Sequence, residues 1–268
     1  MFKYLETVKL DKNLKCKIID LAEKDKVKIL SLSEKCARGN FSCLAHKNDL
    51  LRLAVIIETA EVTAEKYKAA GIPLKIFDDT LDDIRIWCEN NDNKGLKNYN
   101  WIKNHINAEL FKIGRLQFQF FKCSIKFLNY SNLPFSYNDN MIYVHIPQGE
   151  KLDYYECKKS LNQAVKFFSE YFPDYEYRYF FCESWLLYDK NIMYMDKESN
   201  IIKFSSLFDI IYSLPCDSQA IERIYGKRKF NKNKYQEDTS LRKRAKEFML
   251  NGGKLGTGIG IIDKLDLC

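Results

Sequence analysis

The sequence is poor in proline and contains no long apolar run. Five prolines and eleven glycines are spread over 268 residues without a Pro-, Gly- or Ser-rich stretch, which excludes a long flexible linker. No apolar run approaches the roughly 18 residues that a membrane-spanning helix requires. The opening residues, MFKYLETVKLDK, lack the apolar core of a signal peptide. These absences predict a soluble, cytoplasmic protein that does not enter a membrane.

The sequence also lacks the cysteine spacing of a metal or disulfide site. Its nine cysteines are odd in number and include no CxxC pair, so we expect reduced thiols rather than a disulfide framework. Cys36, Cys43 and His46 are the only cluster of metal-ligating residue types. Their spacing fits no common zinc pattern and a fourth ligand is missing nearby. We therefore predict no metal site.

Composition and periodicity predict two folded domains of different class. A chain of 268 residues that is 46% hydrophobic and 14% aromatic can bury a full core. Apolar residues recur at helical spacing up to about residue 112, and the period then changes to that of strands. We place the boundary there, with a helical domain over 1–112 and a sheet domain over 113–268. The predicted fold class is α+β, with helices flanking a mixed sheet.

Capping residues and alternation locate the individual elements. Helices are predicted after Asn48, after Thr80 (in an approximate capping box with Asp83), from Asn98 to Gly114, and from Thr239 to Leu250, with a weaker one around 14–28. Strands are predicted over 115–122, 141–146, 177–187, 201–212 and the closing LGTGIGII, and residues 124–129 extend or pair with this sheet.

The stretch from Met141 to Leu187 is the most informative part of the chain. An apolar strand, MIYVHIP, leads through the turn QGEKLD into an amphipathic helix that Asp153 caps and Pro173 ends, and a second strand follows. A strand that enters a helix in this order directs backbone N–H groups over the turn, which suits an anionic ligand.

Five segments carry a resemblance to a known family: GRLQF at 114–118, HIP at 145–147, CESWLL at 182–187, SNII at 199–202 and the tail TSL…GGKLGTGIG. With these the chain resembles bacterial two-domain acyltransferase-like proteins. Such proteins have a helical N-terminal domain and a C-terminal domain of the GNAT type.

The resemblance implies acyl transfer from an acyl-coenzyme A, such as acetyl-CoA, to an amine acceptor by direct attack in a ternary complex. It implies no permanently bound cofactor. In this fold a strand splays from its neighbour and pairs with the pantetheine arm, while the following loop holds the pyrophosphate. The matching positions are Val144, Ile146, Gln148, Gly149 and Lys151. Glu150 departs from the pattern because it brings an acid to the phosphate loop, and Lys151 could offset its charge.

The strand that contains Cys182, Glu183 and Ser184 supplies candidate catalytic groups. Glu183 is the first candidate for the base that deprotonates the amine, and His145 is the second. Ser184, Tyr188 and Tyr212 are candidates for the acid that protonates the departing thiolate. The alternatives are a surface carboxylate or a partner for Arg115 in the case of Glu183, and a satisfied core imidazole in the case of His145.

Three further alternatives remain open. Cys182 is either a core thiol or, with His145, the nucleophile of a covalent mechanism. The basic tract between Arg223 and Lys246 is a solvated surface, a contact for phosphates of coenzyme A or an acidic acceptor, or, ranked last, a nucleic-acid site. Finally, the whole domain could be a degenerate scaffold that binds only an acyl-thioester or a protein partner.

Overall fold

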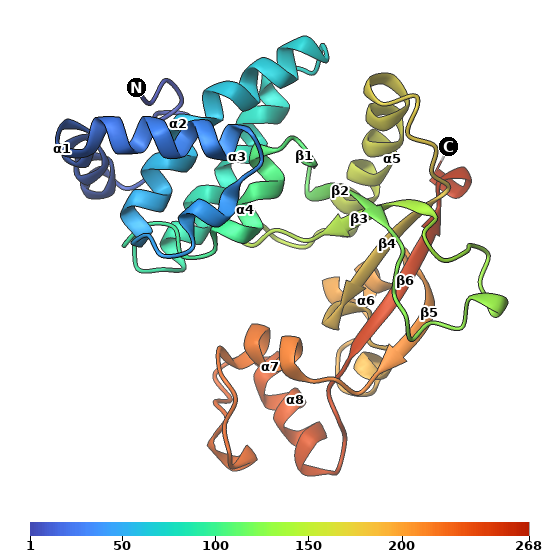
Figure 1. The fold of residues 1–268 in the computed structure, drawn as a ribbon. Helices are drawn as coiled ribbons and strands as arrows, with labels where there is room; N and C mark the ends of the chain where they lie inside the picture. Colours follow the sequence, from blue (N-terminus) through green and yellow to red (C-terminus); the bar gives the residue numbers. More distant parts are fainter. Residues whose placement is uncertain (268) are drawn as a thin grey trace. The chain divides into compact units, whose positions relative to one another are not determined.

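Helices form the first part of the chain, and a six-stranded mixed sheet with flanking helices follows, so the α+β prediction is confirmed (Figure 1). The computed structural model describes residues 1–267. These form two compact units. The first consists of Met1–Gln119, Ile146–Glu150 and Ser169–Phe172, and the second of Phe120–His145, Lys151–Phe168 and the residues from Pro173 onward. None of the helices in residues 1–267 is long and apolar enough to cross a membrane.

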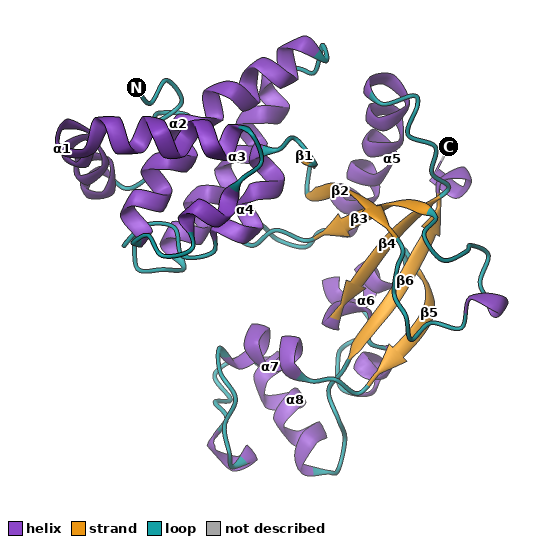
Figure 2. Cartoon of the chain, in the orientation of Figure 1, coloured by secondary structure: helices purple, strands orange, loops and turns teal. Residues whose placement is uncertain are grey.

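Four α-helices build most of the first unit: α1 (Lys12–Ala37), α2 (Asp49–Ala69), α3 (Leu74–Glu89) and α4 (Tyr99–Ile106) (Figure 2). A short 3₁₀ helix, η1 (Phe41–Leu44), connects α1 to α2. The predicted cap of α2 is confirmed, because Asn48 Oδ1 accepts a hydrogen bond of 2.8 Å from the backbone N–H of Leu51.

Two predictions in this region were wrong. Thr80 does not cap a helix; it lies within α3, where its hydroxyl donates to the carbonyl of Ile76 at 2.6 Å and accepts from the N–H of Lys112 at 2.8 Å. The helix from Asn98 ends at Ile106 rather than near Gly114. Ala108 adopts a positive φ of 60°, which stops the helix before the strand that begins at Leu110.

A buried polar cluster joins α3 to α4. Asp83 is only 5% exposed, and its Oδ2 accepts from the indole N–H groups of Trp87 at 3.0 Å and Trp101 at 2.7 Å. Nε2 of the fully buried His105 lies 3.0 Å from the same oxygen. Burial alone would raise the pKa of Asp83, but the hydrogen bonds from His105, Trp101 and Trp87 outweigh it and lower the pKa. This carboxylate therefore stays charged and holds two helices together.

The sheet has the strand order β1-β2-β3-β4-β6-β5. Its strands are β1 (Leu110–Ile113), β2 (Leu116–Lys122), β3 (Asn140–His145), β4 (Tyr179–Ser184), β5 (Asp209–Leu214) and β6 (Thr257–Asp263). β1 and β2 form an antiparallel hairpin in which Ile113 faces Leu116 across a two-residue turn, and Gly114 there has the positive φ, 63°, that such a turn requires. β6 runs antiparallel between β4 and β5.

Four helices flank the sheet or follow it: α5 (Tyr154–Tyr171), α6 (Asn200–Ser205), α7 (Ser218–Tyr225) and α8 (Ser240–Leu250). Short 3₁₀ helices are η2 (Tyr130–Asn132), η3 (Trp185–Leu187), η4 (Asp189–Met193), η5 (Lys232–Lys234) and η6 (Lys264–Leu267). α5 packs on one face of the sheet through Phe168, whose ring contacts those of Phe120 and Tyr177 at centroid distances of 5.5 and 5.9 Å. The predictions of α5 and α8 and of strands β2, β3 and β6 are confirmed.

Three predicted strands differ from the structure. Residues 124–129 form turns and no strand, and the strand predicted to Leu187 ends at Ser184 because η3 follows. The segment after Asn200 first forms α6, since Ser199 Oγ caps it by accepting from the N–H of Ile202 at 3.3 Å. Short apolar runs such as IIKF fit a helix and a strand equally well, so only the cap distinguishes the two.

Alternate glycines just before and within β6 allow a close approach of the chain that follows β4. A Cβ atom at Gly258 would overlap the carbonyl of Leu187, and one at Gly256 would overlap the ring of Tyr188. One face of β6 therefore has no side chain where η3 and its following residue cross it.

Candidate functional site

The two parallel strands of the sheet separate toward their carboxyl ends. β3 pairs with β4 only at Ile142 with Phe180 and at Tyr143 with Phe181, and both strands continue beyond these pairs. Figure 1 shows the two arrows fanning apart toward their tips. We name the strand ends beyond these two pairs, residues 144–145 and 182–184, the splay. On its other edge β4 stays paired with β6 as far as Ser184.

One face of the splay brings together an aromatic ring, an imidazole and a carboxylate. The rings of Tyr143 and His145 stack with centroids 4.3 Å apart and planes inclined by 15°. The Tyr143 hydroxyl donates to the backbone carbonyl of Glu183 at 3.3 Å, so it bridges the two strands where their pairing ends. Glu183 is exposed and His145 is half-buried. The two candidate bases are therefore accessible on the same face.

Tyr143 is a member of this group that the sequence analysis missed. Burial, followed by the charges of Cys182 and Glu183, raises its pKa well above the ordinary value. The hydroxyl therefore keeps its proton at neutral pH and remains a hydrogen-bond donor. Alternation along β3 was the signal that could have found it, because residues i and i+2 share a face and Tyr143 is two residues before His145.

Cys182 and Ser184 lie on the opposite face of β4 by the same alternation. Cys182 is fully buried, and burial raises the pKa of its thiol far above the ordinary value. Ser184 is 6% exposed, and its Oγ accepts a hydrogen bond of 3.2 Å from the N–H of Leu186, which caps η3. The structure thus separates Cys182 from the face of His145, and a buried, protonated thiol is a poor nucleophile.

Tyr188 follows η3 at the carboxyl end of β4. It is 3% exposed, and burial, with a smaller contribution from Asp189, raises the pKa of its hydroxyl. The ring lies directly on the backbone of Gly256. Tyr212, the third candidate acid, lies on β5, where its ring is 5.2 Å from that of Phe127.

The turn after β3 belongs to the first unit and uses its polar groups within that unit. Gln148 accepts a hydrogen bond of 2.9 Å from the side chain of Asn90, and Gly149 has a φ of 94°. The carboxylate of Glu150 is 2.5 Å from Lys112 Nζ, and its carbonyl accepts from Arg115 at 2.9 Å. Lys112 therefore compensates the acid in this loop.

The N-terminus of α5 is occupied by a side chain of the protein. Asp153 Oδ1 accepts from the N–H groups of Tyr155 and Glu156 at 2.9 and 3.1 Å. This confirms the predicted cap, and it also fills donors that a phosphate would need. Ile146 lies in the turn and Val144 is buried on β3. Val144 and Lys151 are parts of the second unit, and Ile146, Gln148 and Gly149 are parts of the first.

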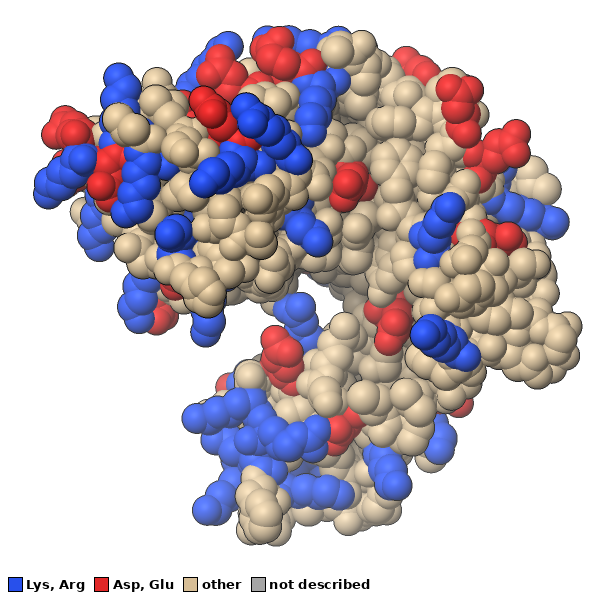
Figure 3. Space-filling view, in the orientation of Figure 1, with Lys and Arg blue, Asp and Glu red and all other residues tan. Residues whose placement is uncertain are grey.

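The basic tract 223–246 comprises the end of α7, η5 and the first part of α8, and Figure 3 shows its Lys and Arg side chains gathered over that segment. Several of these cations have acidic partners: Arg228 with Asp217, Arg242 with Asp238, Lys246 with Glu237 and Arg244 with Asp196. Of the three aromatic residues in the tract, Phe230 is fully exposed, whereas Tyr225 and Tyr235 are 8% and 4% exposed. A series of stacking platforms for successive bases is therefore not built here.

Cys36 and Cys43 approach each other with a sulfur–sulfur distance of 3.8 Å. Burial, then the neighbouring Cys43, raises the pKa of Cys36 to about 12. Over residues 1–267 no group of three or more His, Cys, Asp or Glu side chains is placed to hold a metal ion.

Comparison with known families identifies both parts of the chain. Residues 110–262, more than half of its length, match the family described as GNAT-like C-terminal domain. The chain belongs to this GNAT-like family. Residues 17–108 match the N-acyltransferase N-terminal domain. The family resemblance carried by the sequence motifs is thereby confirmed.

Solved structures of the same fold are acyltransferases. One is an acyltransferase in complex with decanoyl-CoA and teicoplanin, with a TM-score of 0.78 and 18% identity over 97% of this chain and 86% of that chain. A mutant acyltransferase in complex with octanoyl-CoA gives the same TM-score, identity and coverage. At this identity the likeness establishes the fold of the GNAT-like chain alone. Comparison with curated proteins finds no match.

Proposed function

We propose that this GNAT-like protein transfers an acyl group from an acyl-coenzyme A to an amine by direct attack in a ternary complex. The observation that carries the proposal is the splay. Beyond Phe181, β4 keeps β6 on one edge, and residues 1–267 provide no partner strand on the other. An extended, amide-containing arm such as pantetheine can add to such an edge as an extra strand. The solved acyltransferases of this fold contain octanoyl- or decanoyl-CoA, which supports a medium-chain donor as well as acetyl-CoA.

Glu183 is the proposed base. Its carbonyl faces Tyr143 across the splay, and in a strand the N–H of the same residue points to the same edge. The exposed carboxylate takes a proton from the acceptor amine while the amine nitrogen attacks the thioester carbon. The carbon–sulfur bond then breaks, and an acid protonates the departing thiolate. The N–H of Glu183 is a candidate donor to the developing oxyanion.

His145 and Tyr188 complete the proposed machinery. His145 is the second candidate base, since its ring shares the face of Glu183 and is held by stacking on Tyr143. Tyr188, Ser184 and Tyr212 are the candidates for the acid, and a tyrosine hydroxyl is protonated at neutral pH. Cys182 contributes packing in this mechanism, consistent with a fully buried thiol.

A second candidate function is a scaffold that binds an acyl-thioester or a protein partner without catalysis. It is favoured by the phosphate loop, where Asp153 fills N–H groups of α5 and Glu150 is paired with Lys112. In the proposed enzyme, Val144, Ile146, Gln148, Gly149 and Lys151 still contact coenzyme A, but backbone pairing with the arm carries more of the affinity than the loop does.

We also propose the domain division 1–112 and 113–268 and a cytoplasmic location. The division is supported by family matches that end at residue 108 and begin at residue 110. The location is supported by the state of the eight cysteines within the described chain, all of which are free thiols.

The test is a titration with decanoyl-CoA and acetyl-CoA, followed by a transfer assay that detects the released thiol. Glu183→Gln should reduce kcat by about 10²–10⁴-fold, the usual contribution of a general base, and leave the Kd for decanoyl-CoA unchanged. Glu176→Gln, an equally exposed acid, is the matched control and should keep full activity. Full activity in Glu183→Gln would remove this residue from the mechanism. Binding without transfer to any amine would favour the scaffold.

A further inference from the structure

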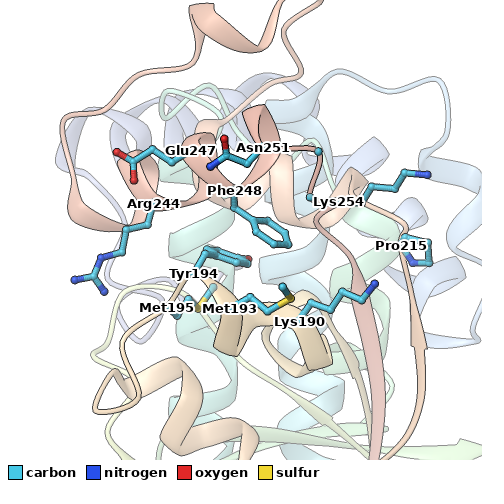
Figure 4. Close-up of a pocket in the computed structure, with 12 residues that line it drawn as sticks. Lys190, Met193, Tyr194, Met195, Pro215, Arg244, Glu247, Phe248, Asn251 and Lys254 are labelled. Carbon is cyan, nitrogen blue, oxygen red and sulfur yellow. The ribbon is translucent and has the colours of Figure 1, made fainter.

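An open cavity of about 930 Å³ lies in the second unit, between η4 and the end of α8 (Figure 4). The loop after α8 and Pro215, which follows β5, complete its walls. A volume of this size suits a small-molecule ligand. Within residues 1–267 its lining contains no residue of the splay.

The chain that leads from β4 to the cavity lies on the face of the sheet opposite Glu183. Gly258 pairs with Ser184 in the sheet, and a Cβ atom at Gly258 would overlap the carbonyl of Leu187. The chain after β4 therefore crosses the sheet on the face of Ser184 and Cys182, and alternation puts Glu183 on the other face. The chain thus reaches the cavity on the side of the sheet away from the carboxylate of Glu183.

The wall formed by η4 is apolar and is held in place by the buried side chain of Asn191. Its Nδ2 donates to the carbonyl of Trp185 at 2.8 Å, and its Oδ1 accepts from the Tyr194 hydroxyl at 2.8 Å. The rings of Tyr194 and Phe248 stack with centroids 4.9 Å apart and planes inclined by 21°. Met193 adds a side chain that is 67% exposed. A fixed aromatic pair beside a flexible thioether suits the apolar part of a ligand.

The wall formed by α8 is shaped by the glycine turn that ends this helix. Gly252 has a φ of 86°, and the N–H of Gly253 donates to the carbonyl of Phe248 at 2.9 Å. A Cβ atom at Gly253 would lie 2.6 Å from the ring of Phe248. Glycine at this position therefore leaves the ring where it stacks on Tyr194. Both walls are built by contacts within the protein, which lowers the entropic cost of binding a ligand between them.

One side of the cavity carries positive charge that the described chain does not neutralise. Lys190 of η4 and Lys254 of the loop after α8 extend to the same side in Figure 4. Both are exposed, and neither forms an ion pair within residues 1–267. Glu247 and Arg244 point to the opposite side, where Arg244 is 3.8 Å from Asp196. The lysine side thus suits an anion such as a carboxylate.

We propose that this cavity is a ligand site of its own, and that its ligand is an apolar carboxylate, meaning a ring or a short chain that carries one carboxylate group. The apolar body lies against Met193 and the stacked rings of Tyr194 and Phe248. The carboxylate lies between Lys190 and Lys254. The assignment does not depend on acyl transfer, because no group of the proposed mechanism lines the cavity.

Calorimetric titration of the full chain with two probes tests the site. 2-Naphthoate represents a flat ring and decanoate a chain, and we expect the better of the two to bind with a Kd below about 1 mM. The amide of that probe has the same apolar body without the charge, and it should bind at least about tenfold more weakly. Failure of both carboxylates to bind, or equal affinity for the better probe and its amide, would overturn the proposal.

Two lysine variants test the carboxylate contact. Lys190→Met/Lys254→Met should remove the preference for the carboxylate over the amide. Lys158→Met/Lys166→Met, which removes two exposed charges from α5, is the matched control and should keep that preference. A preference that persists in the first variant, or that both variants lose alike, would contradict the assignment of the carboxylate to this pair of lysines.

A second pair of variants tests the apolar contact. Met193→Ser should weaken the binding of the acid and of its amide alike, by about threefold or more. Ile192→Ser changes the neighbouring side chain, which is 54% exposed and does not line the cavity, and it should weaken neither. Equal effects of the two changes would show that the probe does not lie in the cavity.

Competition with decanoyl-CoA separates this site from the donor site. The better probe should stay bound in the presence of excess decanoyl-CoA, and Glu183→Gln should leave its Kd unchanged. Displacement of the probe, together with weaker decanoyl-CoA binding in Lys190→Met/Lys254→Met, would assign the cavity to the donor and overturn the proposal. Absence of acyl transfer with probe binding intact would count against the proposed function alone.

Discussion

The carboxylates of Asp83 and Glu183 have opposite surroundings. Asp83 in the helical unit is buried, accepts hydrogen bonds from the indoles of Trp87 and Trp101, and lies 3.0 Å from Nε2 of His105. Glu183 in the sheet unit is exposed. It lies beyond the last pair of β4 with β3, on the same face as His145. A carboxylate therefore holds helices together in one place and is available to a ligand in the other. Burial and the number of donors, rather than residue type, distinguish the two roles.

The largest expected effect is that of Asp83→Ala. The change leaves two indole N–H groups and a buried imidazole without their acceptor, so it should cost about 3–5 kcal/mol of unfolding free energy. Urea unfolding followed by tryptophan fluorescence measures it, because Trp87 and Trp101 both contact Asp83 and report directly on the cluster. Decanoyl-CoA affinity at low temperature should be unchanged. A loss below about 1 kcal/mol would place Asp83 among ordinary surface ion pairs.

The same cluster should make the helical unit acid-sensitive. A carboxyl whose pKa is lowered by folding stabilises the protein above its unfolded value of about 3.9, and the stabilisation is lost as pH falls through the lower folded value. Stability should therefore decline below about pH 4 in the wild type. Asp83→Asn should decline less over that range. Parallel stability curves for the two proteins would contradict the assignment.

His145→Ala tests the opposite side of the comparison. If His145 assists Glu183, acyl transfer should fall by about tenfold or more, near 1.4 kcal/mol in the barrier, while the unfolding free energy changes less than it does in Asp83→Ala. Parallel measurement of kcat and urea midpoint for the two variants is the check. A large loss of stability with normal turnover would show that His145, like His105, is a structural imidazole.

The smallest expected effect is that of Tyr143→Phe. It removes the hydroxyl that bridges β3 to the carbonyl of Glu183, and one hydrogen bond contributes about 0.5–1.5 kcal/mol. The ring and its stacking on His145 remain. We expect a small fall in urea midpoint and a rise in KM for acyl-CoA larger than any change in kcat. An unchanged KM would mean that the bridge does not help to shape the splay.

The sequence predicts the fold where local and long-range signals agree. Asn48, Asp153 and Thr239 cap helices whose apolar stripes face a core, and the alternation in β2 and β3 matches their place in the sheet. The prediction from sequence fails at Thr80, where the side chain contacts Lys112 instead of capping a helix. It also fails after Asn200, where the apolar run is too short for its periodicity to distinguish a helix from a strand.

The candidate site was predictable only in part. The order of strand, turn and helix and the resemblance locate it, and alternation places Glu183 opposite Cys182. Spacing along the chain cannot show which polar groups already have a partner within the protein. The pairing of Glu150 with Lys112 spans 38 residues, and the bridge from Tyr143 to Glu183 spans 40. Such contacts are set by the assembled core rather than by neighbouring residues.

The position of β6 in the sheet has a consequence for how the protein is made. β6 is the last strand along the chain, yet it lies between β4 and β5. During synthesis β4 and β5 leave the ribosome before β6 does. Until β6 is made, each of the two strands has one edge without its final partner. The pairing of Glu183 with Ile259 joins residues that are separated by more than seventy positions along the chain. Such a long separation predicts slow folding of the sheet unit. Pulse-labelling hydrogen exchange during refolding should find β4 protected late, well after the helices α1 to α4.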